Sequence, residues 1–452
     1  MKMKIKKILF LALGLFFVAC TEPEPITNPD NNNGGDNNSG SNNGGGDNNQ
    51  GQGGTPGSVI RPNRTDAQIN EDLRQVYNHY RDNFLRSQST SRGTMAWIDA
   101  SGTSGTNTAT ISEAHGYGMK IFALIAGTSA ARGDEQSIFD NMNRLRRAFP
   151  SNEESRLMAW TVYPNQIANP PAPHTNNATD GCLDNAYALL LAHARWGSNN
   201  TAGHERNYIE QARSIIAGLK AANMHTAIHR TKLGDWHGRW DTSSEAQRTT
   251  SRTSDWRPAH FRAFARATGD NFWNIAADEV YNLLRNVANP TTGLMPDFVI
   301  GNPARVVIAS TANPHPEALV SGEHNHHNFA ANACRVPWFL AMDFAHYGTV
   351  AARDQMNRIS NFLRTRSQGN PTRIYAGSGF RLDGNPITNT DWTSVFFMAP
   401  FAAGMIGDSA NQAFLNATYL NIRNNSMQYE TEYGAAIRLL TMLLITGNWA
   451  AP

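Results

Sequence analysis

The sequence predicts an all-α fold, a toroid built from paired helices. Apolar residues recur every three or four positions in ten segments, whereas few segments alternate in the manner of strands. Long polar loops connect the segments, and a toroid gathers such loops and helix ends around one cleft. An irregular helical repeat protein is the alternative, but the sequence has no fixed period. Glycine follows several segments, as is usual at helix ends: Gly127, Gly197, Gly348 and Gly447.

The predicted helices run through most of the chain. Each is long enough for about three turns or more. In chain order they are residues 67–85, 117–128, 183–196, 204–222, 259–269, 272–287, 336–348, 352–366, 396–406 and 433–447.

The chain begins with an export signal. Residues 1–20 have a basic start, an apolar run of about a dozen residues and a small residue before Cys20, too short a pattern for a membrane span. "FVAC" is typical of a lipoprotein cleavage site, which leaves a lipid-modified Cys20 as the first mature residue. An ordinary signal peptide is the alternative. We expect a lipoprotein anchored to the outer membrane and facing the cell exterior, an orientation for which the acidic "CTEPEP" start is a weak cue.

A tether separates the anchor from the folded part. Residues 21–58 are dominated by Asn and Gly, which cannot bury enough apolar surface to fold. Residues 59–452 then form one domain. Its net charge is near zero and it has no basic tract, which disfavours nucleic-acid binding. We expect a monomer without a cofactor.

Two sets of acidic residues are candidates for chemistry. Glu113 stands directly before an apolar helix, in "SEAHGYGM". Asp180 and Asp184 lie one turn apart at the start of another helix, so both can share a face. Capping and first-turn charge are the alternative explanation for this second pair. Tryptophans in the loops suit the apolar faces of sugar rings, although we expect about half to be core: Trp97, Trp236, Trp240, Trp256, Trp392 and Trp449.

Two motifs resemble those of glycoside hydrolase family 8. "ATDGCLDNAYALLLAHARW" is similar to the family signature, except that Cys182 stands where the family usually has a second Asp, and "SEAHGYGM" is similar to the motif that carries its proton donor. Five further segments match in the expected order: "LGDW", "SRTSDWRPAHFRAFARATGD", "TGLMPDF", "NACRVPW" and "LLTMLLITGNW". The resemblance implies a six-fold double-helix barrel and an inverting hydrolase of β-1,4-linked glycans.

The resemblance also implies roles for individual residues. Glu113 is the expected general acid, and Asp180 the residue that holds the sugar beside the cleaved bond. The other residues that we expect to contact substrate are Tyr117, His115, Arg335, Trp97, Trp236 and Trp256. The arginines and histidines of the loops favour a neutral glycan over a cationic one.

The general base is less certain from the sequence. One branch of the family has its base Asp at the position of Asn332, which cannot accept a proton usefully. In a second branch a Glu eight or nine residues upstream acts instead, and Glu323 stands nine residues before Asn332. Asp255 is the alternative base. The further alternative is a glycan-binding protein with weak or no catalysis, which Cys182 and Asn332 would favour.

Two other features have simpler explanations. The segment "EHNHH" at 323–327 contains metal-ligand residue types, but its spacing is not that of a familiar site and inverting hydrolysis needs no metal. Cys182 and Cys334 are expected to be buried free thiols rather than a disulfide.

Overall fold

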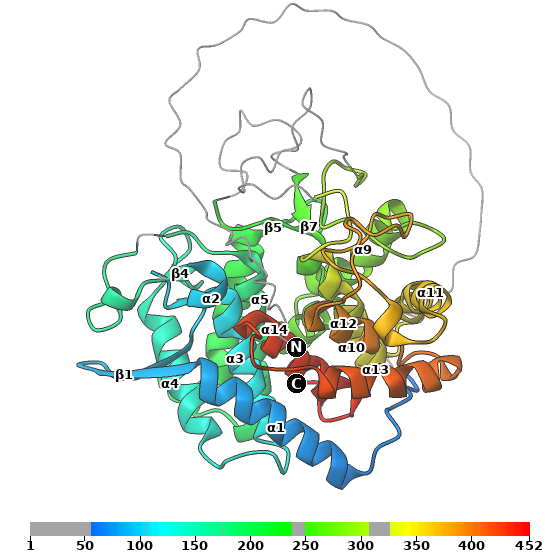
Figure 1. Ribbon diagram of the computed structural model, residues 1–452. Helices are drawn as coiled ribbons and strands as arrows, with labels where there is room; N and C mark the ends of the chain where they lie inside the picture. The colour runs from blue at the N-terminus through cyan, green and yellow to red at the C-terminus, as the bar shows by residue number, and fades with distance from the viewer. Residues whose placement is uncertain (1–55, 106, 174, 237–248, 307–325) are drawn as a thin grey trace, which may run out of the picture.

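The computed structural model describes residues 56–105, 107–173, 175–236, 249–306 and 326–452. Within these ranges it has twelve helices of ten or more residues, arranged as an inner and an outer ring (Figure 1). The inner helices are α3 (Ser112–Ile125), α5 (Thr179–Trp196), α8 (Pro258–Thr268), α10 (Val336–Tyr347), α12 (Val395–Gly404) and α14 (Glu432–Ile445). The outer helices are α1 (Asp66–Phe84), α4 (Glu135–Ala148), α6 (Tyr208–Gly218), α9 (Phe272–Val287), α11 (Val350–Ser367) and α13 (Gln412–Asn424).

The inner ring is closed. α3 packs on α5, α5 on α8, α8 on α10, α10 on α12 and α12 on α14, and α14 packs back on α3. Each inner helix also packs on an outer partner, in the pairs α14–α1, α3–α4, α5–α6, α8–α9, α10–α11 and α12–α13. Six such pairs make an (α/α)6 barrel, and the predicted all-α toroid is confirmed.

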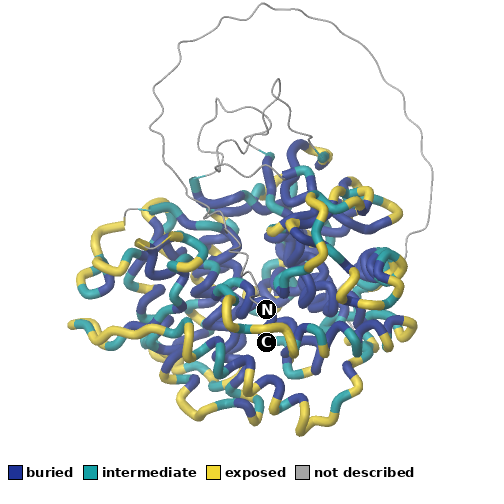
Figure 2. Tube along the Cα trace, viewed as in Figure 1, coloured by how far each residue is buried: buried dark blue, intermediate teal, exposed yellow. Residues whose placement is uncertain are grey.

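The two rings differ in the pattern of their apolar residues. The inner helices are buried on almost every side: all residues of α3 except Glu113 are buried, and in α14 all except Tyr433. The buried apolar residues of an outer helix such as α4 form one stripe, Ile138, Phe139, Met142 and Leu145, and polar residues take up its other faces. Figure 2 shows this as a buried centre with exposed outer turns.

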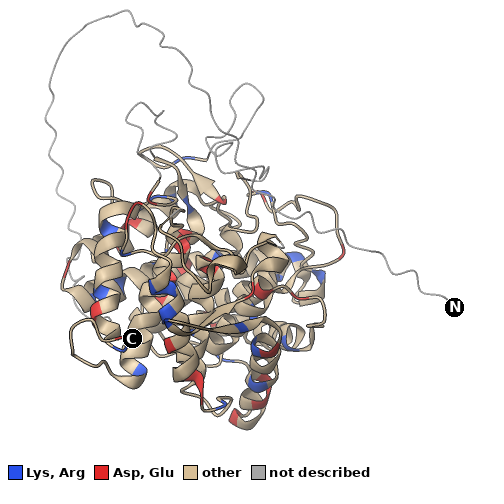
Figure 3. Cartoon of the chain, turned by 90° about the vertical axis from the view of Figure 1, so that its left-hand side faces the viewer, with Lys and Arg blue, Asp and Glu red and all other residues tan. Residues whose placement is uncertain are grey.

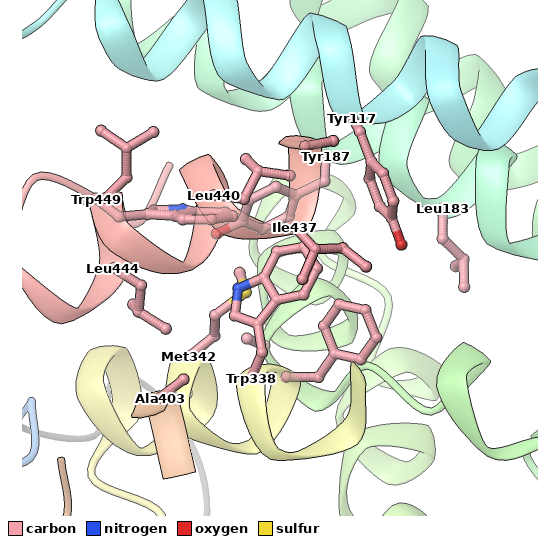
Figure 4. Close-up of a cluster of buried hydrophobic side chains, with 14 of the residues drawn as sticks. Tyr117, Leu183, Tyr187, Trp338, Met342, Ala403, Ile437, Leu440, Leu444 and Trp449 are labelled. Carbon is pink, nitrogen blue, oxygen red and sulfur yellow. The ribbon is translucent and has the colours of Figure 1, made fainter. Parts of the chain in front are cut away.

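Aromatic and aliphatic side chains from the inner helices fill the barrel axis (Figure 4). Tyr117 of α3 lies 5.9 Å from Trp338 of α10, and Trp338 lies 6.0 Å from Trp449, just after α14 (ring centroids). The barrel is therefore a packed core rather than a pore, so a site must lie at an end of the barrel.

Glycines allow α3 and α5 to approach closely. A Cβ atom added to Gly116 would lie 2.6 Å from the Cβ of Asp184, and one added to Gly181 would collide with Ser112. Any larger residue at either position would push the two helices apart. Gly116 belongs to "SEAHGYGM" and Gly181 to "ATDGC", so the glycines of both motifs have a packing role.

Short strands support the loops, in four antiparallel pairs among the described residues. They are β1 (Leu85–Thr90) with β2 (Gly93–Ile98), β3 (Thr110–Ile111) with β4 (Thr161–Val162), β5 (Met224–His225) with β6 (Arg230–Thr231), and β7 (Ser251–Arg252) with β8 (Phe298–Val299). The remaining helical turns are α2 (Ser101–Ser104), η1 (Pro164–Gln166), η2 (Leu219–Asn223), η3 (Thr253–Asp255), η5 (Ala333–Arg335), η6 (Pro371–Arg373) and η7 (Ser409–Asn411). Of the helices described, none is both long and apolar enough to cross a membrane.

Candidate active site

The six inner helices begin at one end of the barrel, where the candidate site lies. Glu113, Asp180 and Tyr433 are the second residues of α3, α5 and α14. Arg335 directly precedes α10, and Asp255 lies three residues before α8. Helix N-termini carry partial positive charge and unpaired N–H groups, so this end of the barrel favours negative charge.

Glu113 is held by two neighbours. The guanidinium of Arg335 binds its carboxylate through Nη1, and the Tyr117 hydroxyl, one turn along α3, donates to Glu113 Oε1 at 3.0 Å. Arg335 also donates to the Tyr117 hydroxyl (3.1 Å), to Ser254 Oγ (2.9 Å) and to Asn332 Oδ1 (3.1 Å). These contacts fix the direction in which the Glu113 carboxyl points.

The surroundings of Glu113 favour its protonated form. Burial raises the pKa of this carboxyl above its usual value, and the nearby Arg335 opposes that rise without cancelling it. The Glu113 side chain is still 16% exposed. A carboxyl with a raised pKa and a path to the outside is suited to act as a general acid.

Asp180 lies beside the same arginine. Its Oδ2 is 3.8 Å from Arg335 Nη1 and 3.4 Å from Arg252 Nη1, and its Oδ1 accepts the N–H of Gly181 at 2.9 Å. No side chain caps α5, whose N-cap residue is Ala178. Asp180 therefore belongs to the charged cluster around Glu113, and helix capping does not explain it.

Asp184 lies one turn deeper and anchors an ionic network below the site (Figure 3 shows charged residues among the helices). It pairs with Lys120 of α3, with Arg257 at 2.5 Å and with His260 at 3.2 Å. Burial would raise the pKa of Asp184, but Arg257 and Lys120 outweigh it and hold the pKa well below its usual range. Burial lowers the pKa of Lys120 to about 8. The network joins α3, which carries Glu113, α5, which carries Asp180, and the start of α8, which follows Asp255 by three residues.

Asp255 is fully buried. Its side chain is 0% exposed, and neither carboxylate oxygen has a hydrogen-bond partner among the described residues. Burial raises the pKa of Asp255 to about 7; Arg252 opposes this rise and Asp180 adds to it. In this arrangement Asp255 does not reach an external water molecule, as a general base must.

Asn332 has a structural role. Its side chain donates to Asp297 Oδ2 at 3.2 Å and accepts from Arg335. Asp297 also accepts the N–H groups of Ala330 (3.0 Å) and Ala333 (2.7 Å), so it holds the turn that leads into α10. The Asn332 side chain therefore links this turn to the guanidinium of Arg335.

Trp236 lies near the start of α5. The "LGDW" loop that carries it is bound to the segment before α5: Asp235 accepts from Ser151 Oγ (2.5 Å) and from the N–H of Asn177 (3.0 Å). The N–H of Thr179 donates to Leu233 O at 3.1 Å. The loop is therefore fixed beside the start of α5, which carries Asp180, and the Trp236 side chain is half-buried.

Three other residues that we expected at the site lie elsewhere. Trp256 is buried and donates to Ser251 Oγ at 2.9 Å, so it is a core residue with no face open to a sugar. His115 is buried against α4, where Nε2 lies 3.0 Å from Met142 O, and burial lowers its pKa to about 3. Trp97 lies in β2, opposite Arg86, in a hairpin that packs on α4. Helical and loop spacing alone did not show which way these rings face.

Other predicted features lie outside the described residues or away from the site. Glu323, Trp240 and Cys20 are outside the described ranges. Cys182 and Cys334 are buried free thiols; Cys182 contacts Met158 O (3.6 Å) on a face of α5 away from Asp180. The described part of the chain contains no group of three His, Cys, Asp or Glu side chains placed to hold a metal.

The structure adds residues that the sequence did not single out. Tyr433 stacks its ring 5.6 Å from the Arg335 guanidinium and donates to Ala331 O at 2.8 Å. Ser254 accepts from Arg335, and Lys120 pairs with Asp184. The sequence contained one indication of the role of Lys120. It is a charged residue in an apolar helix, one helical turn beyond Tyr117 and two beyond Glu113.

Comparison with known proteins agrees with this geometry. The model of the glycosyl hydrolases family 8 matches residues 75–447, most of the chain. The chain belongs to glycosyl hydrolase family 8. It is 32% identical to an endoglucanase of Bacillus sp. strain KSM-330 over 87% of this chain and 80% of that protein. It is 30% identical to a beta-glucanase of Niallia circulans over 87% of this chain and 89% of that protein.

Solved structures show the same fold. The apo structure of a beta-1,3-1,4-glucanase from Paenibacillus sp. X4 superposes with a TM-score of 0.75 at 28% identity, covering 88% of this chain and 97% of that one. A family 8 xylobiose complex from Teredinibacter turnerae has a TM-score of 0.67 at 18% identity, over 86% and 95% of the two chains, and supports the fold alone. As a member of family 8, the protein is a glycoside hydrolase that acts with inversion.

Proposed function

We propose that this family 8 hydrolase is an endo-acting β-glucanase that uses Glu113 as its general acid and Glu323 as its general base. The observation that carries the proposal is the Glu113 carboxyl at the end of the barrel where the inner helices begin, with a raised pKa and a direction fixed by Arg335 and Tyr117. The similarity to an endoglucanase and to two β-glucanases supports a neutral β-glucan as substrate.

The reaction is a single displacement. Glu113 gives its proton to the glycosidic oxygen as the bond from that oxygen to the anomeric carbon breaks. A water molecule attacks the anomeric carbon from the opposite face, and the base accepts the proton that this water loses. Asp180, held between Arg252 and Arg335, is placed to accept hydrogen bonds from the hydroxyl groups of the sugar beside Glu113.

Two observations favour Glu323 over Asp255 as the base. Asp255 is fully buried, whereas a base must contact the attacking water. In the sequence, Glu323 stands three residues before His326. His326 O accepts from the N–H of Phe298 at 3.1 Å, and the Phe298 ring lies 5.3 Å from the Arg252 guanidinium, which contacts Asp180. The described segment that directly follows Glu323 in the sequence is therefore linked to Asp180, and this supports Glu323 as the base.

The export and anchoring of the protein are part of the proposal. The signal-like residues 1–20, Cys20 and the Asn- and Gly-rich segment that follows support a hydrolase tethered by lipid to the outer membrane and facing outward. Such a tether would let the barrel reach polymers that are too large to cross the membrane.

The test is hydrolysis of a panel of soluble β-glycans by wild type and Glu113→Gln. We expect wild type to lower the viscosity of mixed-linkage β-glucan before much reducing sugar appears, because internal cleavage shortens the polymer early. Glu113→Gln should reduce kcat by roughly 10²–10⁴, the usual contribution of a general acid. The absence of hydrolysis on every β-glycan would contradict the proposal and favour a glycan-binding protein. An unchanged kcat for the Glu113→Gln variant would remove Glu113 from its role.

A further inference from the structure

One tryptophan differs from the others in its exposure. The Trp392 side chain is 44% exposed, whereas every other tryptophan in the described part of the chain is buried or only half-buried. It lies three residues before α12, at the end of the barrel that carries Glu113. An exposed indole needs an explanation when its backbone is held in place.

The backbone around Trp392 is held by the loop after η6. The N–H of Gly377 donates to Trp392 O at 3.1 Å, and the N–H of Ala376 donates to Thr393 Oγ1 at 3.0 Å. A side chain on Gly377 would meet Thr390 at 2.6 Å, so the two segments lie in close contact. The indole is therefore presented from a fixed base, and little conformational freedom would be lost when a ligand binds to it.

Aromatic residues of α12 and α14 connect this end of α12 to the catalytic acid. Phe396, in the first turn of α12, has its ring centroid 5.4 Å from that of Tyr433. The Tyr433 ring lies 5.6 Å from the Arg335 guanidinium, and Arg335 binds Glu113. Trp392 precedes Phe396 by four residues in the sequence, so its backbone lies on the α12 side of the site.

We propose that Trp392 forms a sugar-binding platform for a glycan unit remote from the cleaved bond, on the α12–α14 side of Glu113. This proposal rests on the proposed function. In β-1,4-linked glucose every ring substituent is equatorial, so each ring presents an apolar C–H face that matches an exposed indole. Covering that face removes apolar area from water on both partners. The chemical class is an unsubstituted β-1,4-linked hexopyranose chain.

A chain-length series tests the platform. Trp392→Ala should leave kcat/KM unchanged for short β-1,4-linked glucose oligosaccharides. For oligosaccharides long enough to reach the indole, the variant should lower kcat/KM by about tenfold, which corresponds to about 1.4 kcal/mol. Trp392→Phe should recover part of the loss. Leu420→Ala is the matched control: Leu420 is 41% exposed, but it lies on the outer helix α13. Equal kcat/KM of Trp392→Ala and wild type at every length, or an equal loss at every length, would overturn the proposal.

A binding measurement separates this proposal from the proposed function. Calorimetric titration of Glu113→Gln with a long oligosaccharide needs no turnover. The Glu113→Gln/Trp392→Ala double variant should bind about tenfold more weakly, and Glu113→Gln/Leu420→Ala should bind as Glu113→Gln does. If wild type shows no hydrolysis but this difference in affinity is still measured, the proposed glycan platform is supported and the proposed β-glucanase activity is contradicted. Equal affinity of the double variant and Glu113→Gln would remove Trp392 from glycan binding.

Discussion

Arg335 binds the carboxylate of Glu113 and lies 3.8 Å from that of Asp180, so one buried cation holds both the acid and its neighbour. Two opposing effects therefore act on the pKa of Glu113. Burial raises the pKa of its carboxyl, and Arg335 lowers it. The balance matters for catalysis, because a general acid must carry its proton when substrate binds.

The first prediction concerns the pH profile of the Arg335 variants. In an inverting hydrolase the loss of the acid's proton causes the fall of kcat/KM on the alkaline side. Removing the positive charge with Arg335→Met raises the pKa of Glu113, so the alkaline limb should move to higher pH, with a lower maximum because Glu113 is no longer oriented. Arg335→Lys keeps the charge and should move the limb less. An alkaline limb that moves to lower pH in Arg335→Met would contradict this account.

The second prediction concerns Asp255 and stability. Its folded pKa, about 7, is above the unfolded value near 3.9. The folded state therefore binds the proton more tightly, and this contribution to stability is complete below about pH 4 and lost as pH rises through 7. It is on the order of 4 kcal/mol. The free energy of unfolding can be measured with denaturant at pH 4 and at pH 8. From pH 4 to pH 8, wild type should lose this contribution and Asp255→Asn should not, so the variant should gain stability relative to wild type. Parallel pH dependence in the two proteins would show that Asp255 is ionised when folded.

The third prediction assigns the base. Glu323→Ala should abolish turnover and leave oligosaccharide binding intact, because only deprotonation of water is lost. Added azide, which attacks the anomeric carbon without needing a base, should restore cleavage and give a glycosyl azide. Asp255→Ala serves as the comparison and should mainly lower stability or binding. A folded, inactive Asp255→Ala beside an active Glu323→Ala would mean that the base is Asp255.

The fourth prediction concerns the anchor. Wild-type protein should partition with the membrane fraction, and Cys20→Ser should either be released into the soluble fraction or accumulate with its signal uncleaved. Metabolic labelling with a fatty acid should mark wild type and not the variant. Wild type recovered entirely from the soluble periplasm, without label, would contradict lipid attachment.

Much of the fold could be predicted from the sequence. All six inner helices were expected, but α4 and α13 were not. α4 buries only four apolar side chains, and α13 contains three Asn residues, which are weak helix formers, so the α13 helix depends on packing against α12. The hairpin β1–β2 was also missed, because it is polar on most of its surface.

The candidate site was predictable where a motif fixes both residue and direction. Glu113, Tyr117, Asp180 and Arg335 do meet. Trp256 and His115 were expected to face sugar, but residue type alone does not say on which side of a helix or loop a ring packs. Tyr433 and Lys120 enter the site from helices that are distant in sequence or otherwise apolar, and only the closed ring of helices brings them to it.

The stereochemistry of the first product tests the central claim most directly. With Glu113 as acid and a water attacking from the opposite face, hydrolysis inverts the anomeric carbon. Proton NMR during the first minutes of cleavage of a β-1,4-linked glucose oligosaccharide should show the α-anomer first, with the β-anomer growing later by mutarotation, and no such signal should appear with Glu113→Gln. A β-anomer formed first would contradict the account.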